Sequence, residues 1–499
     1  MLVHTRRIFP SCQSFGRRRI IVNQSESSIS VRVTSEAPGR PHKRWTGIRC
    51  MSIQLQQRRV INNNDNIILS QQPFQSRWNA TTTSSSLSNY YLNVKDCQTV
   101  EEAVKITYDQ LPYASHRNLS AFWSVVPKLL KKNNGSEKMQ DVEQLNHQIN
   151  HILGHTMEQV HAYNHIDLTQ TALAFAKIVK EVGDESLPRD SPSRILNDVF
   201  IGGINKEFIF KVLAVRAMSI LHEFDARHLS NLIYAYGLAE VIVKYEDGST
   251  FFDILAQAAI PNLKTFEPQG FSIMLWAYAT AKVPNPQLFK EVGDIIVELD
   301  SLEDYWPQGL SNIVWSYATL GESHPKLFTK IADHMVQLDN LDYFWPQALS
   351  NITWAYSIAK ESNPSLFQKI SDAAIKRRNE FTSQGVADLL WAFATNGQLD
   401  NNLFISFEPV AASFVTQCSG QDLANIGWAY AVAKVEAPSL FNDDFINVCV
   451  DKEDEFEIKE LRQLYQWHTW QEEIKSGISL PPSFQKRCHD SFISTETDI

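Results

Sequence analysis

Amide side chains recur at two fixed places in this sequence, each at a constant distance before an aromatic residue. An asparagine stands three residues before the aromatic and a glutamine stands seven residues before it. Because an amide both donates and accepts hydrogen bonds, a row of amides could contact base edges or a peptide backbone, and the aromatic could stack on a base. The candidates are Asn231, Asn312, Asn351, Asp388 (an aspartate in the asparagine position) and Asn425, with Gln269, Gln308, Gln347, Gln384 and Gln421.

Each of these sets also has a structural interpretation. A glutamine near a helix start can cap free backbone N–H groups, and a ladder of asparagines can satisfy backbone groups between stacked helices. An aromatic residue at a fixed helical position beside small residues is typical of a packed core. The sequence alone leaves binding and structural roles open.

The aromatic residues belong to an internal repeat with a spacing of 37 to 42 residues. In each unit the aromatic is followed by alanine or serine and then by a second aromatic, as in Trp354-Ala355-Tyr356, and a Leu-Phe pair ends thirteen residues later in the last five units. The repeat anchors are Tyr234, Trp276, Trp315, Trp354, Trp391 and Trp428. A register kept over this many units predicts a repeat architecture.

Each unit is predicted to contain two helices. Around Trp354, the residues Leu349, Ile352, Tyr356 and Ala359 follow the 3.6-residue period of one apolar face. Prolines precede both predicted helices, where a first-turn proline loses no hydrogen bond. One hairpin cannot bury both faces alone, and the small residue after the anchor allows a neighbouring helix to approach. We therefore expect an all-α protein, an α-solenoid of stacked helical-hairpin repeats of about 37–42 residues.

The chain is expected to have four parts. Residues 119–124 and 168–177 match the first-helix pattern weakly, and residues 461–470 lie about one repeat beyond Trp428. These matches place divergent repeats or caps on either side of the regular array. The predicted parts are a presequence with a disordered linker at 1–90, divergent N-terminal repeats at 91–226, the helical array at 227–450 and a C-terminal cap at 451–499.

The first ninety residues differ from the rest in charge. They hold 13 Lys+Arg against 3 Asp+Glu, among many serines, which is typical of an organellar transit peptide. We expect import into the mitochondrion, with the chloroplast as the alternative; a basic arm that binds nucleic acid directly is the other interpretation. The longest apolar stretches are broken by charged residues or proline, so no membrane insertion is expected.

The repeat resembles a known family. A unit of about 38 residues with L-S-N-I-x-W-A-Y in its first helix is similar to the octotricopeptide repeat of organellar RNA-binding proteins, which are related to FAST-kinase-like proteins. The resemblance covers residues 115–475 and is strongest over 227–445. It implies single-stranded RNA as the partner, and a role in transcript stability, RNA processing or translation beside other proteins of those processes. Residues 464–473 resemble the segment that leads into a RAP domain, but with the chain ending at Ile499 we expect no RAP domain.

The charge of the array favours a different partner. Residues 227–450 contain 13 Lys+Arg and 25 Asp+Glu, whereas phosphate binding normally uses a basic stripe. Lys376, Arg377 and Arg378, with Lys330 and Lys369, are the candidate phosphate contacts, although basic residues late in a helix also offset its dipole. The alternative function is a protein-binding scaffold of HEAT or armadillo type, in which the asparagine stripe holds an extended peptide.

Enzymatic and metal functions are not expected. The sequence has no G-x-G-x-x-G, G-x-x-x-x-G-K-[S/T], H-E-x-x-H or G-x-S-x-G motif, and its 19 glycines leave little material for phosphate loops. No cofactor is therefore expected. His151, His155, His161 and His165 are interpreted as polar surface residues, and the six cysteines, which form no C-x-x-C pair, as inert thiols.

Overall fold

The structure is a computed structural model of the 499-residue chain. It describes residues 18–25, 28–35, 94–132, 141–183, 191–203 and 206–494. The chain divides into two compact units, Met1–Asn89 and Tyr90–Ile499. Each unit is described separately below.

Within the first unit the structure describes a two-stranded antiparallel hairpin. Strand β1 (Arg18–Ser25) pairs with β2 (Ser28–Ser35), with Arg18 opposite Ser35 and Ser25 opposite Ser28. The β-branched run 20–22 favours an extended backbone. This hairpin departs from the expectation that residues 1–90 lack regular structure. The rest of the predicted presequence and linker lies outside the described residues.

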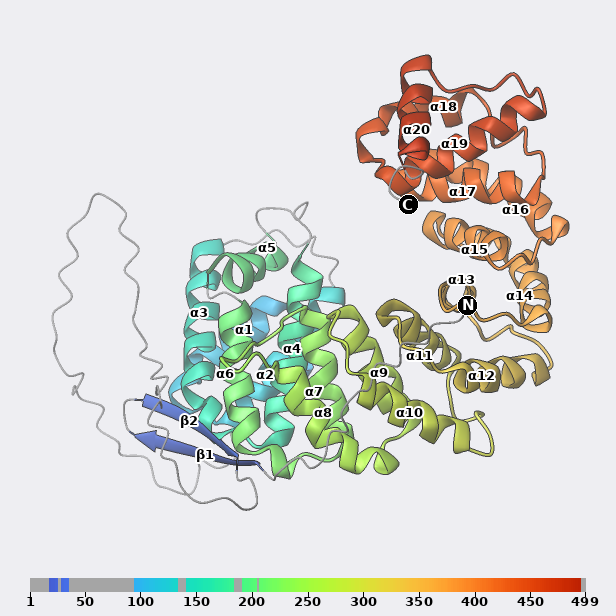
Figure 1. Cartoon of the computed structure of the whole chain (residues 1–499). Helices are drawn as coiled ribbons and strands as arrows, with labels where there is room; N and C mark the ends of the chain where they lie inside the picture. Colours follow the sequence, from blue (N-terminus) through green and yellow to red (C-terminus); the bar gives the residue numbers. More distant parts are fainter. Residues whose placement is uncertain are drawn as a thin grey trace, which may run out of the picture. The chain divides into compact units, whose positions relative to one another are not determined.

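The second unit is helical in its described residues, and two kinds of helix alternate along it (Figure 1). We call the helix that carries the repeat anchor, or its equivalent position, the first helix of a unit. The next helix of nine or more residues is the second helix. The first helices are α2 (His116–Lys132), α4 (His165–Val182), α7 (Ala226–Ala239), α9 (Pro268–Thr280), α11 (Pro307–Leu320), α13 (Pro346–Ile358), α15 (Ser383–Thr395), α17 (Gly420–Ala433) and α19 (Ile458–Glu473). The second helices are α3 (Val142–Gln159), α6 (Lys206–Ser219), α8 (Phe251–Ala259), α10 (Pro286–Glu298), α12 (Pro325–Gln337), α14 (Pro364–Lys376), α16 (Asn401–Phe414), α18 (Asp443–Asp451) and α20 (Pro482–Ile493).

The remaining elements are shorter. Helix α1 (Val100–Asp109) packs on α3, and α5 (Pro192–Asn197) continues into the π-helical turn η5 (Asp198–Gly203). The 3₁₀ turns are η2 (Val94–Asp96), η3 (Leu111–Tyr113), η4 (Val160–Ala162), η6 (Leu221–Glu223), η7 (Ile260–Thr265), η8 (Arg378–Glu380), η9 (Val415–Gln417) and η10 (Glu453–Glu455). Most of these turns connect a second helix to the next first helix.

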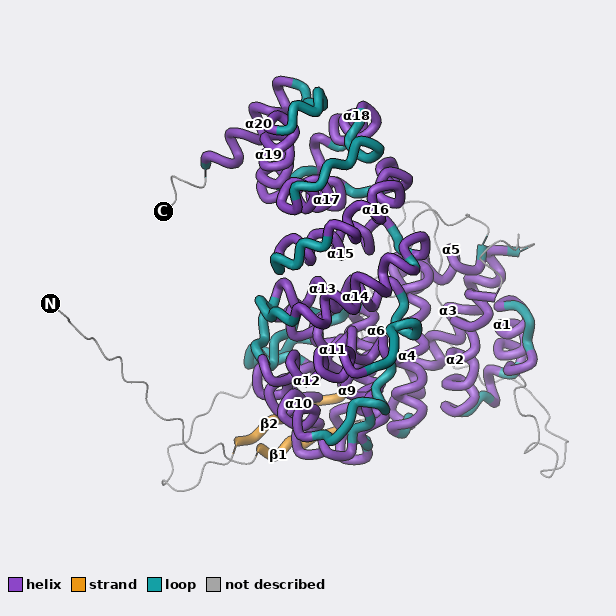
Figure 2. Tube along the Cα trace, turned by 90° about the vertical axis from the view of Figure 1, so that its right-hand side faces the viewer, coloured by secondary structure: helices purple, strands orange, loops and turns teal. Residues whose placement is uncertain are grey.

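The helices form two layers. Successive first helices pack side by side from α2 to α19, and α10, α12, α14 and α16 pack in a second layer with sparser contacts. The alternation of first and second helices along the chain can be followed in the tube of Figure 2. The predicted α-solenoid is confirmed for the described residues of this unit. The weak sequence matches at 119–124, 168–177 and 461–470 lie in α2, α4 and α19, which continue the first-helix layer at both ends.

Proline and capping side chains set the starts of the helices. Pro307 and Pro346 occupy the first turn of α11 and α13, as the sequence predicts. Asn363 precedes α14, and its side-chain oxygen accepts a hydrogen bond from the backbone N–H of Leu366 at 3.0 Å. Helix α11 ends at Leu320 and is capped by Gly321, whose φ of 68° is the left-handed conformation that glycine adopts at low cost.

In five of the first helices, a tyrosine two residues after the anchor joins the helix to the second helix before it. Its ring is buried, and its hydroxyl donates a hydrogen bond of 2.5 to 2.8 Å to the backbone carbonyl of the phenylalanine in that second helix. The pairs are Tyr236 with Phe210, Tyr278 with Phe252, Tyr317 with Phe289, Tyr356 with Phe328 and Tyr430 with Phe404. Burial raises the pKa of these phenols above their ordinary range, so they remain protonated donors.

The same pairs also meet ring to ring. The Phe328 and Tyr356 rings lie 5.0 Å apart at 73°, an edge-to-face contact that adds to the burial of both rings. In α15 a phenylalanine, Phe393, replaces the tyrosine and keeps the contact to Phe367 at 5.0 Å without a hydroxyl. The Leu-Phe pair therefore contributes core contacts to the second helix, as predicted.

Small residues bring adjacent first helices close together. A Cβ placed on Gly237 of α7 would come within 2.5 Å of the Cβ of Ala277 in α9. Ala277 is the small residue that follows the Trp276 anchor, so the predicted close approach is confirmed at this pair. A larger side chain at either position would force α7 and α9 apart.

We predict that Tyr356→Phe lowers the free energy of unfolding by about 1 kcal/mol, because the Phe328 carbonyl loses one hydrogen bond while the ring contact remains. Urea denaturation of the full chain measures the change. Tyr343→Phe is the matched control, since Tyr343 is 83% exposed. Equal losses in both variants would contradict a structural role for the buried hydroxyl.

Candidate functional site

The candidate glutamines lie at the second residue of successive first helices. All five are exposed at the start of α9, α11, α13, α15 or α17. In the order of these helices they are Gln269, Gln308, Gln347, Gln384 and Gln421. Because these helices pack side by side, the glutamines form a row along one edge of the first-helix layer.

The candidate asparagines lie one helical turn further on and are less accessible. Asn231, Asn312, Asn351 and Asp388 are half-buried, and Asn425 is buried. Some of their amides are used within the fold, since Gln308 Nε2 donates to Asn312 Oδ1 at 2.9 Å and Gln463 Nε2 donates to Asn425 Oδ1 at 3.0 Å. Asn231 and Asn351 make no side-chain hydrogen bond within the described part of the chain.

The anchor aromatics complete a stripe along the first helices. Tyr234, Trp276, Trp315, Trp354 and Trp428 are half-buried, and Trp391 is 9% exposed. Adjacent rings come near one another at two places: Tyr234 and Trp276 have centroids 5.3 Å apart, and Trp391 and Trp428 have centroids 6.5 Å apart. We call this row of glutamine, asparagine and anchor aromatic the amide-aromatic stripe.

A serine stands four residues before the anchor in four of the units, and it does not belong to this stripe. The spacing predicts that it shares the face, but Ser230, Ser272, Ser311 and Ser350 are all buried. The close packing of the first helices explains the difference: Ser350 Oγ donates to the Gly385 carbonyl of the next first helix at 2.8 Å. Consecutive residues of a helix point about 100° apart, so Ser350 faces the neighbouring helix while Asn351 faces the surface.

One member of the stripe, Asp388, has a raised pKa. Burial, with repulsion from Asp422, raises the pKa of Asp388 to about 6, and a hydrogen bond from Gln384 opposes the shift. Asparagine occupies the equivalent place in α11, α13 and α17. Asp388 therefore carries a proton below pH 6 and can donate a hydrogen bond there, whereas above pH 6 it only accepts.

The predicted phosphate contacts are engaged inside the protein. Lys376 Nζ lies 2.9 Å from the Asp342 carboxylate, and Arg377 pairs with Glu380 at 2.6 Å. Arg378 donates to the Ile375 carbonyl at 3.1 Å.

The two further lysines cap the ends of second helices. Lys330 Nζ donates to the Leu299 carbonyl at 2.6 Å, and Lys369 donates to the carbonyls of Val336 and Leu338. Four of the five basic candidates thus contact the helix end or loop of the repeat before them. The fifth, Arg378, contacts the end of its own helix.

Aromatic residues that the sequence reasoning missed lie at the starts of α11 and α13. Trp306 and Trp345 are the residues before the first-turn prolines, and both are exposed. The signal was present in the sequence, because both belong to a Trp-Pro-Gln triplet in phase with the repeat. A missed cation also contacts the stripe, since Lys459 Nζ lies 5.6 Å from the Trp391 ring centroid.

Histidines and cysteines do not assemble a reactive site in the described residues. His155 lies 3.7 Å from Glu158, and His161 contacts the Glu158 carbonyl. Within the described ranges no group of three His, Cys, Asp or Glu could hold a metal ion, and no helix could span a membrane. Cys97, Cys418, Cys449 and Cys488 are buried free thiols, and burial raises the pKa of Cys418 and Cys488 to about 12.

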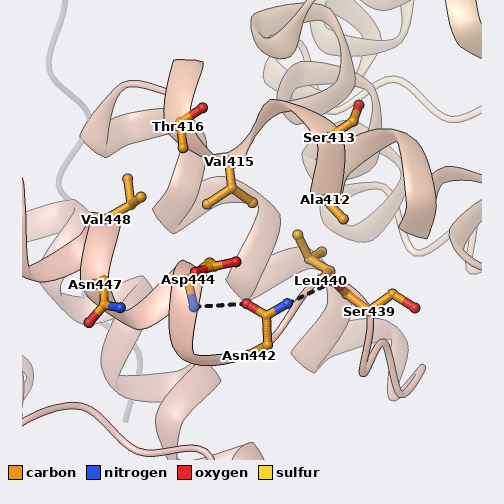
Figure 3. Close-up of a pocket in the computed structure, with 10 residues that line it drawn as sticks. All are labelled: Ala412, Ser413, Val415, Thr416, Ser439, Leu440, Asn442, Asp444, Asn447 and Val448. Carbon is orange, nitrogen blue, oxygen red and sulfur yellow. Dashed lines mark hydrogen bonds between the residues drawn. The ribbon is translucent and has the colours of Figure 1, made fainter.

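A pocket of about 350 Å³ lies between α16, η9, α18 and the loop before α18 (Figure 3). One of its two asparagines, Asn442, caps α18: Oδ1 accepts from the backbone N–H of Asp444 at 3.0 Å, and Nδ2 donates to the Ser439 carbonyl at 3.1 Å. The other polar groups in the wall include the hydroxyls of Ser413 and Thr416. The pocket involves none of the predicted site residues.

Comparison with known proteins gives little guidance. No model of a protein family matches this chain, and no curated protein matches it at a significant level. Among solved structures, a chain in a homology model of the full-length AP-3 complex in an intermediate open conformation is similar to it, with 10% identity and a TM-score of 0.23. The match covers 81% of this chain and 77% of that chain. So distant a likeness carries no argument about function.

We predict that Asp388→Asn stabilises the protein at pH 7 by about 1 to 3 kcal/mol more than at pH 4. The folded pKa lies above the ordinary aspartate value, so between about pH 4 and 6 the folded state retains a proton that the unfolded state has lost. Stability of the parent protein therefore falls as pH rises through this window. Urea denaturation at both pH values tests this, with Asp339→Asn as an exposed control; a gain independent of pH would contradict it.

Proposed function

We propose that this protein binds single-stranded RNA along the amide-aromatic stripe. The observation that carries the proposal is the repetition of the stripe, with exposed glutamine, half-buried asparagine and half-buried tryptophan, on α11 and α13, which pack side by side. Bases of a single strand are accessible on both faces and edges, and repeat proteins can contact one base per helical unit with two or three side chains.

The stripe supplies the two contacts that such binding needs. Asn351 has no side-chain hydrogen bond in the described residues, so its amide is available to a base edge. The partly exposed ring of Trp354 on the same face could stack on a base. The resemblance to octotricopeptide repeats, which rests on the L-S-N-I-x-W-A-Y pattern, supports RNA as the ligand.

The cellular role follows from the same resemblance and from the basic N-terminal segment. We propose that the protein works in the mitochondrion, or alternatively in the chloroplast, on the stability, processing or translation of one or a few transcripts. Its partners would be that RNA and other proteins of RNA processing or translation. The proposed role is binding without catalysis and requires no cofactor.

Charge supports a second candidate function, a scaffold that binds an extended peptide on the same stripe. Residues 227–450 carry an excess of 12 acidic groups, and the basic candidates Lys330, Lys369 and Lys376 are held by carbonyls or a carboxylate. RNA binding without a free basic stripe would depend on stacking and amide contacts more than on phosphates, which lowers its sensitivity to salt.

We predict that Trp315→Ala with Trp354→Ala weakens RNA binding by about tenfold or more, because two stacking platforms are lost. The full chain is first used to select ligands from a random pool of single-stranded RNA. The affinity of an enriched oligonucleotide is then measured by fluorescence anisotropy for the parent and the double variant.

The control is Ile405→Ala, which removes an exposed side chain from the second-helix layer on α16. It should bind RNA as the parent does, and circular dichroism should show that both variants are folded. A pool without enrichment would reject the RNA proposal. If the double variant instead loses a stoichiometric protein partner, the scaffold function is supported.

A further inference from the structure

Two tryptophans occupy equivalent places at the edge of the first-helix layer. Trp306 and Trp345 are the residues immediately before α11 and α13, and they are 80% and 69% exposed. The loops that carry them align residue by residue, with buried Leu302 and Leu341 three residues after the helix-end leucines. Large aromatic side chains at this exposure favour contact with a partner.

Two cations from the next repeat already contact the loop that carries Trp345. The Arg377 guanidinium lies 5.8 Å from the Trp345 ring centroid, and its Nη1 donates to the Phe344 carbonyl at 2.8 Å. The neighbouring Lys376 Nζ lies 2.9 Å from the carboxylate of Asp342. In this loop the lysine therefore pairs with the carboxylate, and the arginine that follows it lies over one face of the tryptophan ring.

The loop that carries Trp306 has the same ring and a carboxylate, but it lacks the contacts from a lysine and an arginine. Glu303 interacts electrostatically with His334, and burial lowers the pKa of that imidazole, which favours its neutral form at pH 7. Glu303 stands where the other loop has Asp342, and Gln337 and Leu338 stand where the next repeat has Lys376 and Arg377. The position of Tyr343 is taken here by a further acid, Asp304. Within residues 206–494 neither Glu303 nor Asp304 forms a salt bridge, and both are exposed.

We propose that Glu303, Asp304 and Trp306 form a docking surface for a dibasic segment of a partner protein. A Lys-Arg pair in an extended peptide would place its ammonium on Glu303 and its guanidinium over the Trp306 ring, as Lys376 and Arg377 do for Asp342 and Trp345. The two acidic groups beside the ring favour a cationic ligand and repel phosphate. We call these three residues the Trp306 surface.

The inference is independent of RNA binding. The Trp306 surface lies in the loop that precedes α11, and the amide-aromatic stripe runs along the helices that follow such loops. Failure of either proposal leaves the other standing, because different residues and different ligand charges are involved.

The test uses the full chain and a short fluorescent peptide with a central Lys-Arg pair, titrated by anisotropy. The parent protein should bind this peptide and not its Gln-Gln counterpart. Trp306→Ala should weaken binding by about fivefold or more, the loss expected for one cation-π contact. Trp345→Ala is the matched control and should leave binding unchanged, since Arg377 already covers that ring.

A second variant tests whether internal cations can block the Trp306 surface while its three residues are kept. Gln337→Lys with Leu338→Arg installs the internal cations of the next loop and should block the peptide while Glu303, Asp304 and Trp306 remain. Parent-like binding by this double variant or by Trp306→Ala would overturn the proposal. So would a single-stranded RNA that depends on Trp306 when the peptide does not, because the surface would then belong to nucleic acid.

Discussion

The stack depends on a phenol hydroxyl that reaches back to the carbonyl of the preceding second helix. In five of the first helices this bond and the ring contact beside it restrict how the helix can shift or rotate against the preceding second helix, as in Tyr356 and Phe328. Where Phe393 interrupts the series, other polar contacts join the same repeats: Ser357 Oγ donates to the Ala392 carbonyl at 2.8 Å, and Asn396 Nδ2 donates to the Glu361 carbonyl at 2.8 Å. Hydrogen bonds between the neighbouring first helices α13 and α15 thus hold these repeats together where the bond between a first helix and the preceding second helix is missing.

Several lysine and arginine side chains bind groups of the protein itself, and this reduces the positive charge that is available to a ligand. Lys330 and Lys369 satisfy helix-end carbonyls that would otherwise lack partners, and Arg377 binds a loop carbonyl and an adjacent carboxylate. Their positive charge is directed at the backbone of the preceding repeat. These contacts, with those of Lys376 and Arg378, use five basic side chains of an array that has an excess of acids. Aromatic and amide groups are therefore the repeated features of its exposed faces.

Local patterns predicted most of the fold, because helix periodicity, first-turn proline and repeat phase are properties of one unit. The helix starts at Pro307 and Pro346 and the exposed position of Gln347 follow from such patterns. The burial of Ser350 and the engagement of Lys376 could not be predicted in this way, since each depends on a neighbouring unit more than thirty residues away. The hairpin at 18–35 was missed because its β-branched residues lie within a composition typical of a presequence.

The repetition of the stripe has a consequence for any ligand that lies across several helices. A perfectly periodic surface would offer equivalent alignments displaced by one unit, so the ligand could slide without loss of contacts. Ile273 stands where α11 and α13 have asparagine, and Asp388 brings an ionisable acid to the same place in α15. These two exceptions remove the translational degeneracy of the array. They act as fixed marks that distinguish one alignment of an extended molecule from the next.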